Sequence, residues 1–122
     1  MTTVTRIEQV IPSSKAISGD ADGWTTIDLS TMPANMAATA PGPNISEIAV
    51  RILPTAAGDV TIVFKDDPGA AVAANADTGQ TILKGATLVH GRIMTRYVSI
   101  RGQSAGAWSG ELLLLSYPGG SW

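Results

Sequence analysis

The fold class follows from one segment, Glu111-Leu112-Leu113-Leu114-Leu115-Ser116-Tyr117. Four consecutive leucines place apolar groups on both faces of a strand, whereas a half-exposed strand alternates apolar and polar residues. In a chain of 122 residues, one face of this strand is expected to pack on the core of its own domain. We expect the other face to meet a neighbouring element or a second subunit.

Alternating apolar residues and turn residues recur along the chain at the spacing of short strands. The clearest strand covers 45–54, where Ile48, Val50 and Ile52 share one face, and we expect it to form a hairpin with a strand at 60–65. Further strands are predicted over 3–11, 24–30, 80–84, 87–94, 96–101 and 111–117, with a loop over 13–23.

These segments add up to about seven or eight strands without a helix, the pattern of two antiparallel sheets packed face to face. The prediction is an all-β fold, an antiparallel β-sandwich of the jelly-roll kind in a single domain over 1–122. Residues 1–12 are predicted to form an N-terminal strand or extended arm. Residues 31–44, which contain three prolines, are predicted to form a long loop.

Charge and composition argue against several classes of protein. A net charge of −2 and a pI near 5.1 give no basic face for nucleic acid, so no nucleic-acid partner is expected. The absence of cysteine excludes disulfides, cysteine-bound zinc and thiol nucleophiles. We see neither a secretory signal over 1–8 nor an apolar span of about 18 residues, so no membrane partner is expected.

Catalytic chemistry has little support in the sequence. The single histidine, His90, has no nucleophile or orienting acid near it in sequence, and we interpret it as a polar residue on the wet side of a strand. Asp20 and Asp22 begin like a calcium loop, but Trp24 stands where a third oxygen ligand belongs, which favours a turn before a strand. We therefore expect no enzyme, no cofactor, and no catalytic or metal-binding residue.

Arginine and tryptophan side chains leave alternatives open. Arg92, Arg96 and Arg101 either form a small basic patch for an acidic partner or lie on a solvated face with intramolecular pairs to Glu47 or Glu111. Trp24 and Trp108 either stack on sugar rings or pack at the edge of the core.

The chain resembles small virion proteins of tailed bacteriophages, above all the head decoration, or cement, proteins. The resemblance lies in size, absence of cysteine, Ala/Gly/Thr-rich composition, an extended N-terminal segment, and the segments Arg96-Tyr97-Val98-Ser99-Ile100-Arg101 and Glu111-Leu112-Leu113-Leu114-Leu115. It covers the overall plan and no diagnostic motif, so no functional residue is carried over. It implies a dimeric or trimeric sandwich or jelly-roll subunit, made in the host cytoplasm, that binds the major capsid protein across capsomer boundaries on the capsid surface.

Candidate contact residues follow from this hypothesis. Self-association is assigned to Leu112, Leu113, Leu114, Leu115 and Trp122, with either Leu113 and Leu115 or Leu112 and Leu114 facing outward. Docking on the shell is assigned to Val4, Arg6, Ile7, Met32 and Met36. The alternative is a receptor- or carbohydrate-binding module of a phage tail fibre or lectin-like protein, with Trp24 or Trp108 as its glycan platform.

Overall fold

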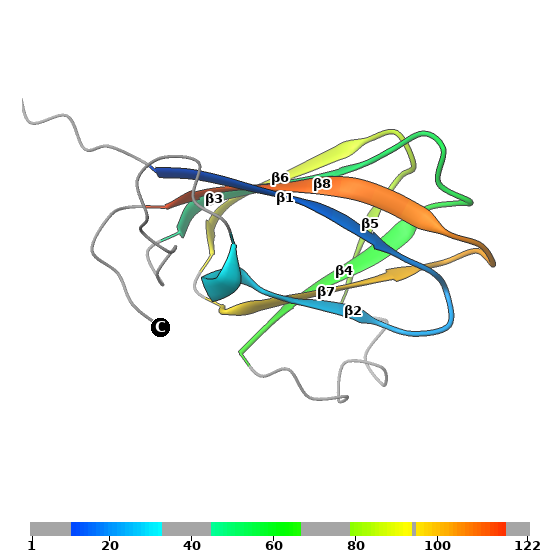
Figure 1. The fold of residues 1–122 in the computed structure, drawn as a ribbon, viewed down its shortest axis with the longest axis horizontal. Coiled ribbons are helices and arrows are strands. Elements are labelled where there is room, and N and C mark those ends of the chain that lie inside the picture. Colours follow the sequence, from blue (N-terminus) through cyan, green and yellow to red (C-terminus); the bar gives the residue numbers. More distant parts are fainter. Residues whose placement is uncertain (1–10, 33–44, 67–78, 94, 117–122) are drawn as a thin grey trace, which may run out of the picture.

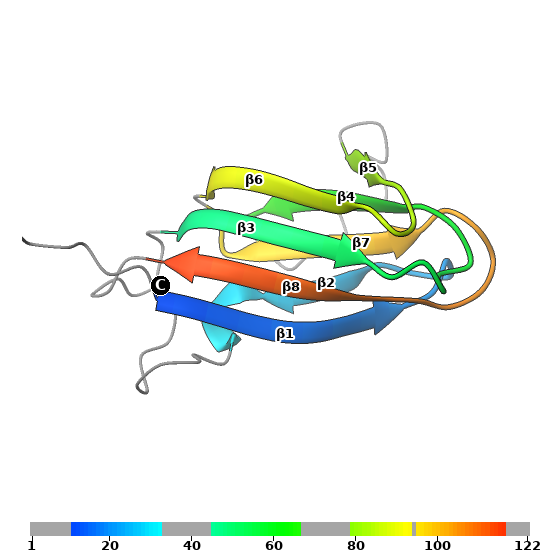
Figure 2. The same cartoon turned by 90° about the horizontal axis from the view of Figure 1, so that it is seen from above.

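The described part of the chain is built almost wholly of strands. The computed structural model describes residues 11–32, 45–66, 79–93 and 95–116. Its elements are β1 (Ile11–Gly19), β2 (Thr25–Asp28), a 3₁₀ turn η1 (Leu29–Thr31), β3 (Ile45–Ile52), β4 (Val60–Lys65), β5 (Gln80–Ile82), β6 (Thr87–Ile93), β7 (Tyr97–Gly102) and β8 (Trp108–Ser116). The strands form two antiparallel four-stranded sheets, β1-β8-β3-β6 and β2-β7-β4-β5, packed face to face (Figures 1 and 2). The predicted antiparallel β-sandwich is confirmed.

The strand pairing is that of a jelly roll. β1 pairs with β8, β2 with β7, β3 with β6 and β4 with β5, all antiparallel. The chain is therefore one long hairpin of four successive strand pairs, with its tip between β4 and β5. Rolling this hairpin up brings β3 beside β8 and β4 beside β7, which completes the two sheets.

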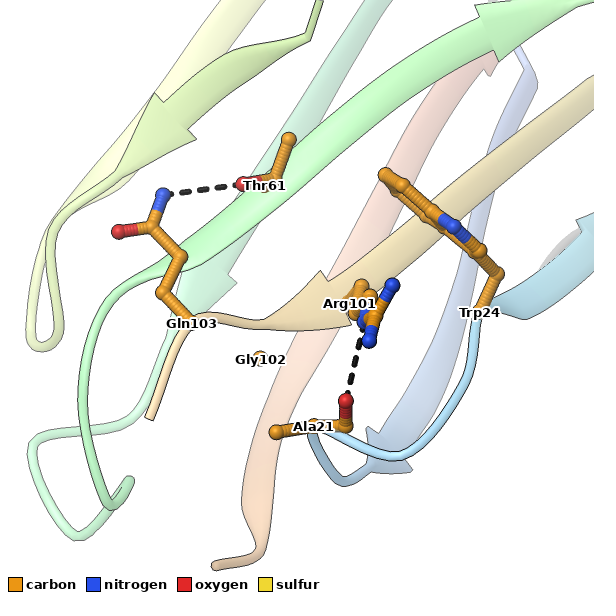
Figure 3. A pocket seen from close by; sticks show the side chains of 6 residues that line it. All are labelled: Ala21, Trp24, Thr61, Arg101, Gly102 and Gln103. Carbon is orange, nitrogen blue, oxygen red and sulfur yellow. Dashed lines mark hydrogen bonds between the residues drawn. The ribbon is translucent and has the colours of Figure 1, made fainter. Parts of the chain in front are cut away.

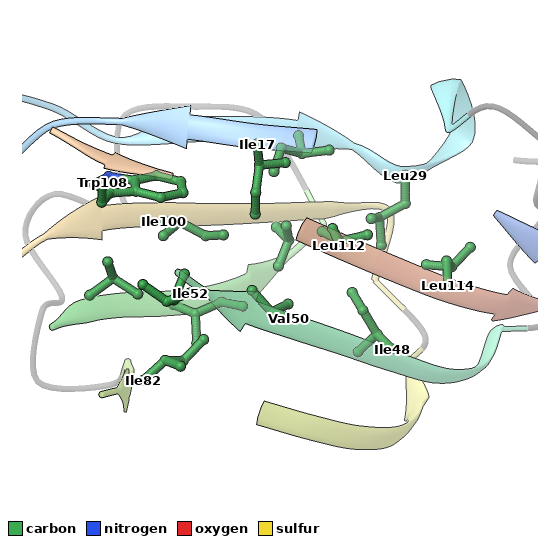
Figure 4. Close-up of a cluster of buried hydrophobic side chains, with 14 of the residues drawn as sticks. Ile17, Leu29, Ile48, Val50, Ile52, Ile82, Ile100, Trp108, Leu112 and Leu114 are labelled. Atoms are coloured by element: carbon green, nitrogen blue, oxygen red, sulfur yellow. The ribbon is translucent and has the colours of Figure 1, made fainter. Parts of the chain in front are cut away.

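The core lies between the two sheets and is mainly aliphatic (Figure 4). Ile48, Val50 and Ile52 are buried on the same face of β3, as their alternation predicts. The buried apolar side chains are Ile17, Ile27, Leu29, Met32, Ile48, Val50, Ile52, Ala56, Val60, Ile62, Ile82, Val98, Ile100, Trp108, Leu112 and Leu114.

Trp108 packs into one end of this core because two glycines leave room for its indole. A Cβ added to Gly19, its register partner on β1, would lie 2.9 Å from Cζ2 of the ring. A Cβ added to Gly102 would lie 3.1 Å from Cδ1 of the ring. Any larger residue at either position would push the indole out of its place.

The predicted loop over 13–23 is wrong in its first half, because Ile11–Gly19 form strand β1. Of its described side chains only Ile17 is buried, while Ser14, Lys15 and Ala16 are exposed, so the sequence shows no apolar alternation. The backbone ladder to β8 makes this segment a strand. The strand predicted over 3–11 and the N-terminal arm lie outside the described residues, apart from 11 and 12.

The predicted hairpin between β3 and β4 is also wrong. β3 lies between β8 and β6 in one sheet, and β4 lies between β7 and β5 in the other. The connection crosses from sheet to sheet and is fixed to the start of β8 and the residue before it, with Leu53 N–H donating to Ser109 O (2.9 Å) and Ala57 N–H donating to Ala107 O (3.0 Å). Alternation shows which face of a strand is apolar, but it does not show with which strand it pairs.

Candidate functional site

The outer face of the β1-β8-β3-β6 sheet carries an apolar row. Directly opposite residues of an antiparallel ladder point to the same side, and the registers align Ser14, Leu113, Ala49 and Val89 across the four strands. Leu113 is 40% exposed and Val89 is 59% exposed. No described element lies over this face, which Figure 2 shows from above. The row is therefore open to a partner.

A polar row runs beside the apolar one. It consists of Ala16, Glu111, Arg51 and Thr87, one residue from each strand, and all four are exposed. Glu111 and Arg51 are cross-strand neighbours of opposite charge. Below, "the outer face" means these two rows together with Glu47, which lies on the other side of the apolar row.

The outer face is uneven because large and small side chains alternate across it. Leu113 and Val89 protrude, whereas Ala49 and Ser14 are small. A shallow hollow of about 380 Å³ lies over β1 and β8, lined by Ser14, Lys15, Ala16, Glu111, Leu112 and Leu113. The face thus offers protruding apolar groups and the depressions that such groups fill.

The leucine strand divides its residues between the two faces. Leu112 and Leu114 are fully buried in the core, and Leu113 is on the outer face with Leu115 half-buried on the same side. Of the two alternatives left open by the sequence, the structure has Leu113 and Leu115 outward. Leu112 and Leu114 are thus removed from the candidate self-association surface, and Trp122 lies outside the described residues.

Most of the residues predicted to dock on the shell lie in parts of the chain that the structure does not describe. Val4, Arg6, Ile7 and Met36 lie outside the described residues. Met32 is 2% exposed and belongs to the core, so its assignment to docking is wrong. The sequence misled here because Met32 closes the turn η1, with its N–H donating to Leu29 O, and its side chain belongs to the core cluster.

A second candidate site is a hollow of about 370 Å³ beside Trp24, lined by Ala21, Trp24, Thr61, Arg101, Gly102 and Gln103 (Figure 3). We call it the Trp24 hollow. Arg101 Nε donates to Ala21 O (2.9 Å), which fixes the guanidinium beside the indole. Gln103 Nε2 donates to Thr61 Oγ1 (2.9 Å) and Thr81 Oγ1 (3.0 Å), which leaves its carbonyl oxygen as an acceptor.

Only one of the two predicted glycan-platform residues is at a surface. Trp24 is half-buried at the Trp24 hollow. Trp108 is 2% exposed and packs in the core, so its assignment as a platform is wrong. Gly19 on β1 and Gly102 on β7 are the residues that let the ring into the core.

Arg96 and Arg101 are engaged within the chain. Arg96 donates from Nε to Asp28 Oδ1 (3.0 Å) and from Nη2 to Asp28 Oδ2 (2.9 Å), a two-pronged ion pair. Hydrogen bonding to Arg96 lowers the pKa of Asp28 from 3.8 to about 2. Ser99 is fully buried and shares a 2.8 Å hydrogen bond with Thr26. Arg96 is therefore paired within the chain, but its partner is Asp28 and not the predicted Glu47 or Glu111.

His90 does not lie on the wet face that the sequence suggested. Its register partner is the buried Ile48, so its side chain is on the inner face of β6, at the open edge of the sandwich. There its ring contacts that of Phe64, with centroids 5.3 Å apart. Within the described ranges, no group of three or more His, Cys, Asp or Glu residues is placed to hold a metal ion.

The sequence analysis missed the residues that complete the outer face. Glu47, Ala49 and Arg51 lie on the face of β3 opposite the buried Ile48, Val50 and Ile52, and no role was predicted for that face. Val89 was missed because the adjacent apolar Leu88 hides the alternation of β6. The signal that finds them is cross-strand register, which sequence alone does not provide.

Comparisons with known proteins found no matching family model and no matching curated protein. Similar solved structures include the following two. A crystal structure of a Neisseria meningitidis protein shares 17% identity at a TM-score of 0.42, covering 93% of this chain and 89% of that one. A structure of Bacillus endospore appendages, described as disulfide-linked pili, shares 16% identity at a TM-score of 0.45, covering 96% and 98%. Similarity at this level assigns no role to this chain.

Among the described residues, no helix is long and apolar enough to cross a bilayer.

Proposed function

We propose that this chain is a non-enzymatic structural subunit that works through protein–protein contacts. The observation that carries the proposal is the outer face, where Leu113 and Val89 stand exposed in one row on a rigid sheet. Apolar side chains aligned on an open face gain free energy when a partner removes them from water.

The specific role we propose is that of a capsid decoration, or cement, subunit of a tailed bacteriophage. A subunit of this kind binds many copies of one site on an assembled head and stabilises the head by contacts alone. It needs a stable body and an apolar surface for self-association, and a jelly roll with the outer face has both. The resemblance of the sequence to such proteins supports the same role.

Co-sedimentation tests this role. Heads assembled from the major capsid protein encoded in the same genome are mixed with the purified chain and spun through sucrose. We expect the chain to travel with the heads at saturable stoichiometry and to raise their melting temperature. A genome with no capsid gene, or a chain left at the top of the gradient at every concentration, would refute the role.

A carbohydrate- or receptor-binding module is the second candidate, and the Trp24 hollow is the observation that favours it. An indole, a guanidinium and an amide oxygen around one depression match the apolar face and hydroxyls of a sugar ring.

A glycan array tests the second candidate. Binding that is lost in Trp24→Ala and kept in Lys84→Ala would support it, since Lys84 is exposed and outside the hollow. An array without signal for the wild type would remove it.

A further inference from the structure

We infer that the outer face is a two-fold contact between two copies of this chain, with β3 of one copy over β8 of the other. This inference rests on the self-association part of the proposed function and specifies its partner and register. The two-fold axis runs parallel to the strands, midway between β3 and β8, which are neighbours in the sheet.

Such an axis places large side chains against small ones. It lays Leu113 over the partner's Ala49 and Val89 over the partner's Ser14, because all four residues belong to one row. The hollow lined by Ser14, Ala16 and Leu113 then receives the partner's Val89. Close packing of this kind is the condition for a specific interface.

The same axis makes the charges complementary. Glu111 and Arg51 face each other across β8 and β3 in the polar row, and the rotation exchanges the two strands. Arg51 therefore lies over the partner's Glu111, and symmetry repeats this contact.

The other symmetric arrangement fits less well. An axis across the strands would lay Leu113 over the partner's Leu113 and Val89 over the partner's Val89, so protruding groups would meet. Ala49 would face the partner's Ala49 and leave a gap. Arg51 would face the partner's Glu47 and not its Glu111. Reversing the charge of Glu111 would therefore weaken the dimer in the first arrangement only.

The size of the face sets the strength of the contact. Eight residues of β3 at about 3.4 Å each, and four strands at about 4.8 Å, give a footprint of about 500 Å² per copy. The pair buries about 1,000 Å², the lower limit for a specific interface. The dimer is therefore weak and forms at high concentration.

Two single charge reversals test the register by sedimentation equilibrium. Arg51→Glu alone puts acid against acid between copies, and Glu111→Arg alone puts base against base. We expect each to weaken the dimer about tenfold. An equal mixture of the two restores opposite charges at both contacts, and its dissociation constant returns to within about threefold of the wild type.

A matched mixture controls for net charge. Lys84→Glu changes the charge as Arg51→Glu does, but Lys84 lies in the turn after β5, away from the outer face. Lys84→Glu mixed with Glu111→Arg should give no gain over the separate proteins. Leu113→Gln, which changes no charge, should also abolish the dimer. It takes the place of Arg51→Glu if circular dichroism shows that Arg51→Glu is unfolded.

Each possible result overturns a different part of the two proposals. A wild type that stays monomeric at every concentration overturns the inference. Glu111→Arg that dimerises like the wild type, or a mixture without restored affinity, overturns the register. Head binding is measured separately, so a monomer that binds heads refutes only the dimer, and a dimer that ignores heads refutes only the capsid role.

Discussion

Asp28 connects three parts of the fold through one carboxylate. Oδ1 accepts from Ser30 N–H (3.0 Å) and Ser30 Oγ–H (2.6 Å), which caps the turn η1. The same carboxylate holds Arg96, whose carbonyl oxygen accepts from Leu29 N–H (2.8 Å). The end of β2 is thereby tied to the start of β7.

This arrangement predicts a pH-dependent stability. The folded-state pKa of Asp28 is lowered from 3.8 to about 2, so its contribution is complete above pH 3.8 and is lost as the pH falls toward 2. Asp28→Asn should lower the free energy of unfolding by about 1 kcal/mol at pH 7, since the pair is partly exposed. Denaturant titrations should show this difference shrinking between pH 4 and pH 2.

Asp22→Asn is the matched control. Asp22 is exposed, and its carboxylate has no hydrogen bond or ion pair in the described part of the chain. Its substitution should change stability little at any pH. A deficit of Asp28→Asn that is the same at pH 2 and pH 7 would contradict the assignment.

Gly110 supports a second prediction at the residue scale. A Cβ on Gly110 would collide with the carbonyl oxygen of Arg51 on the neighbouring strand. Gly110→Ala should therefore cost about 2 kcal/mol in urea unfolding. Gly23→Ala is the control, because a Cβ there meets nothing within 4 Å and the change should be close to neutral. Equal stability of the two variants would show that β3 and β8 adjust without cost.

Single residues were predictable from sequence where one strand determines their position. Alternation placed Ile48, Val50 and Ile52 in the core correctly. Trp108 was not predictable, because its burial depends on glycines of two other strands. The same holds for the outer face, whose rows join residues from four strands.

At the scale of elements, strand existence was easier to predict than strand partnership. β4 agrees with its predicted bounds, and β6 and β8 overlap theirs, because turn residues and alternation mark them locally. β1 was missed because a sheet edge tolerates serine and lysine, which a local pattern assigns to a loop. The β3–β4 connection was misjudged because chain proximity suggested pairing, whereas both strands pack their apolar faces across the core.

Position within the sheets predicts hydrogen exchange. β8, β3, β7 and β4 have a neighbour on each side, whereas β1, β6, β2 and β5 are edges. Amides of the four central strands should exchange most slowly, and those of β5, which has only three residues, most quickly. Exchange followed by mass spectrometry or NMR measures this order. Protection of β5 equal to that of β8 would contradict the sheet order.

At the scale of the whole molecule, the two sheets of the sandwich present two different surfaces to solvent. The inner faces of both sheets supply the core, so the monomer folds without help from the outer face. The outer face of the other sheet is polar along β7 and carries the Trp24 hollow. The surfaces proposed for self-association and for sugar binding therefore lie on opposite sides of the sandwich, so we expect a change to one surface to leave the other intact.

Leu113 and Leu114, which are adjacent on β8, allow the effects of substitution on folding and on association to be measured separately. The proposed dimer stabilises the folded state by mass action, so a hundredfold rise in concentration above the dissociation constant adds up to about 1.4 kcal/mol per subunit, because the free monomer concentration rises only as the square root of the total. This shift raises the melting temperature of the wild type by several degrees. Leu113→Gln removes an apolar contact of the outer face and should make the melting temperature independent of concentration, while matching the dilute wild type.

Leu114→Gln provides the contrast within the same strand. Leu114 is fully buried, so its replacement puts an amide into the core and should cost about 3 kcal/mol or more at every concentration. Scanning calorimetry over a hundredfold range of concentration measures both effects. If Leu113→Gln kept the concentration dependence of the wild type, copies of this chain would meet through a surface other than the outer face, since Leu113 lies at the centre of that face.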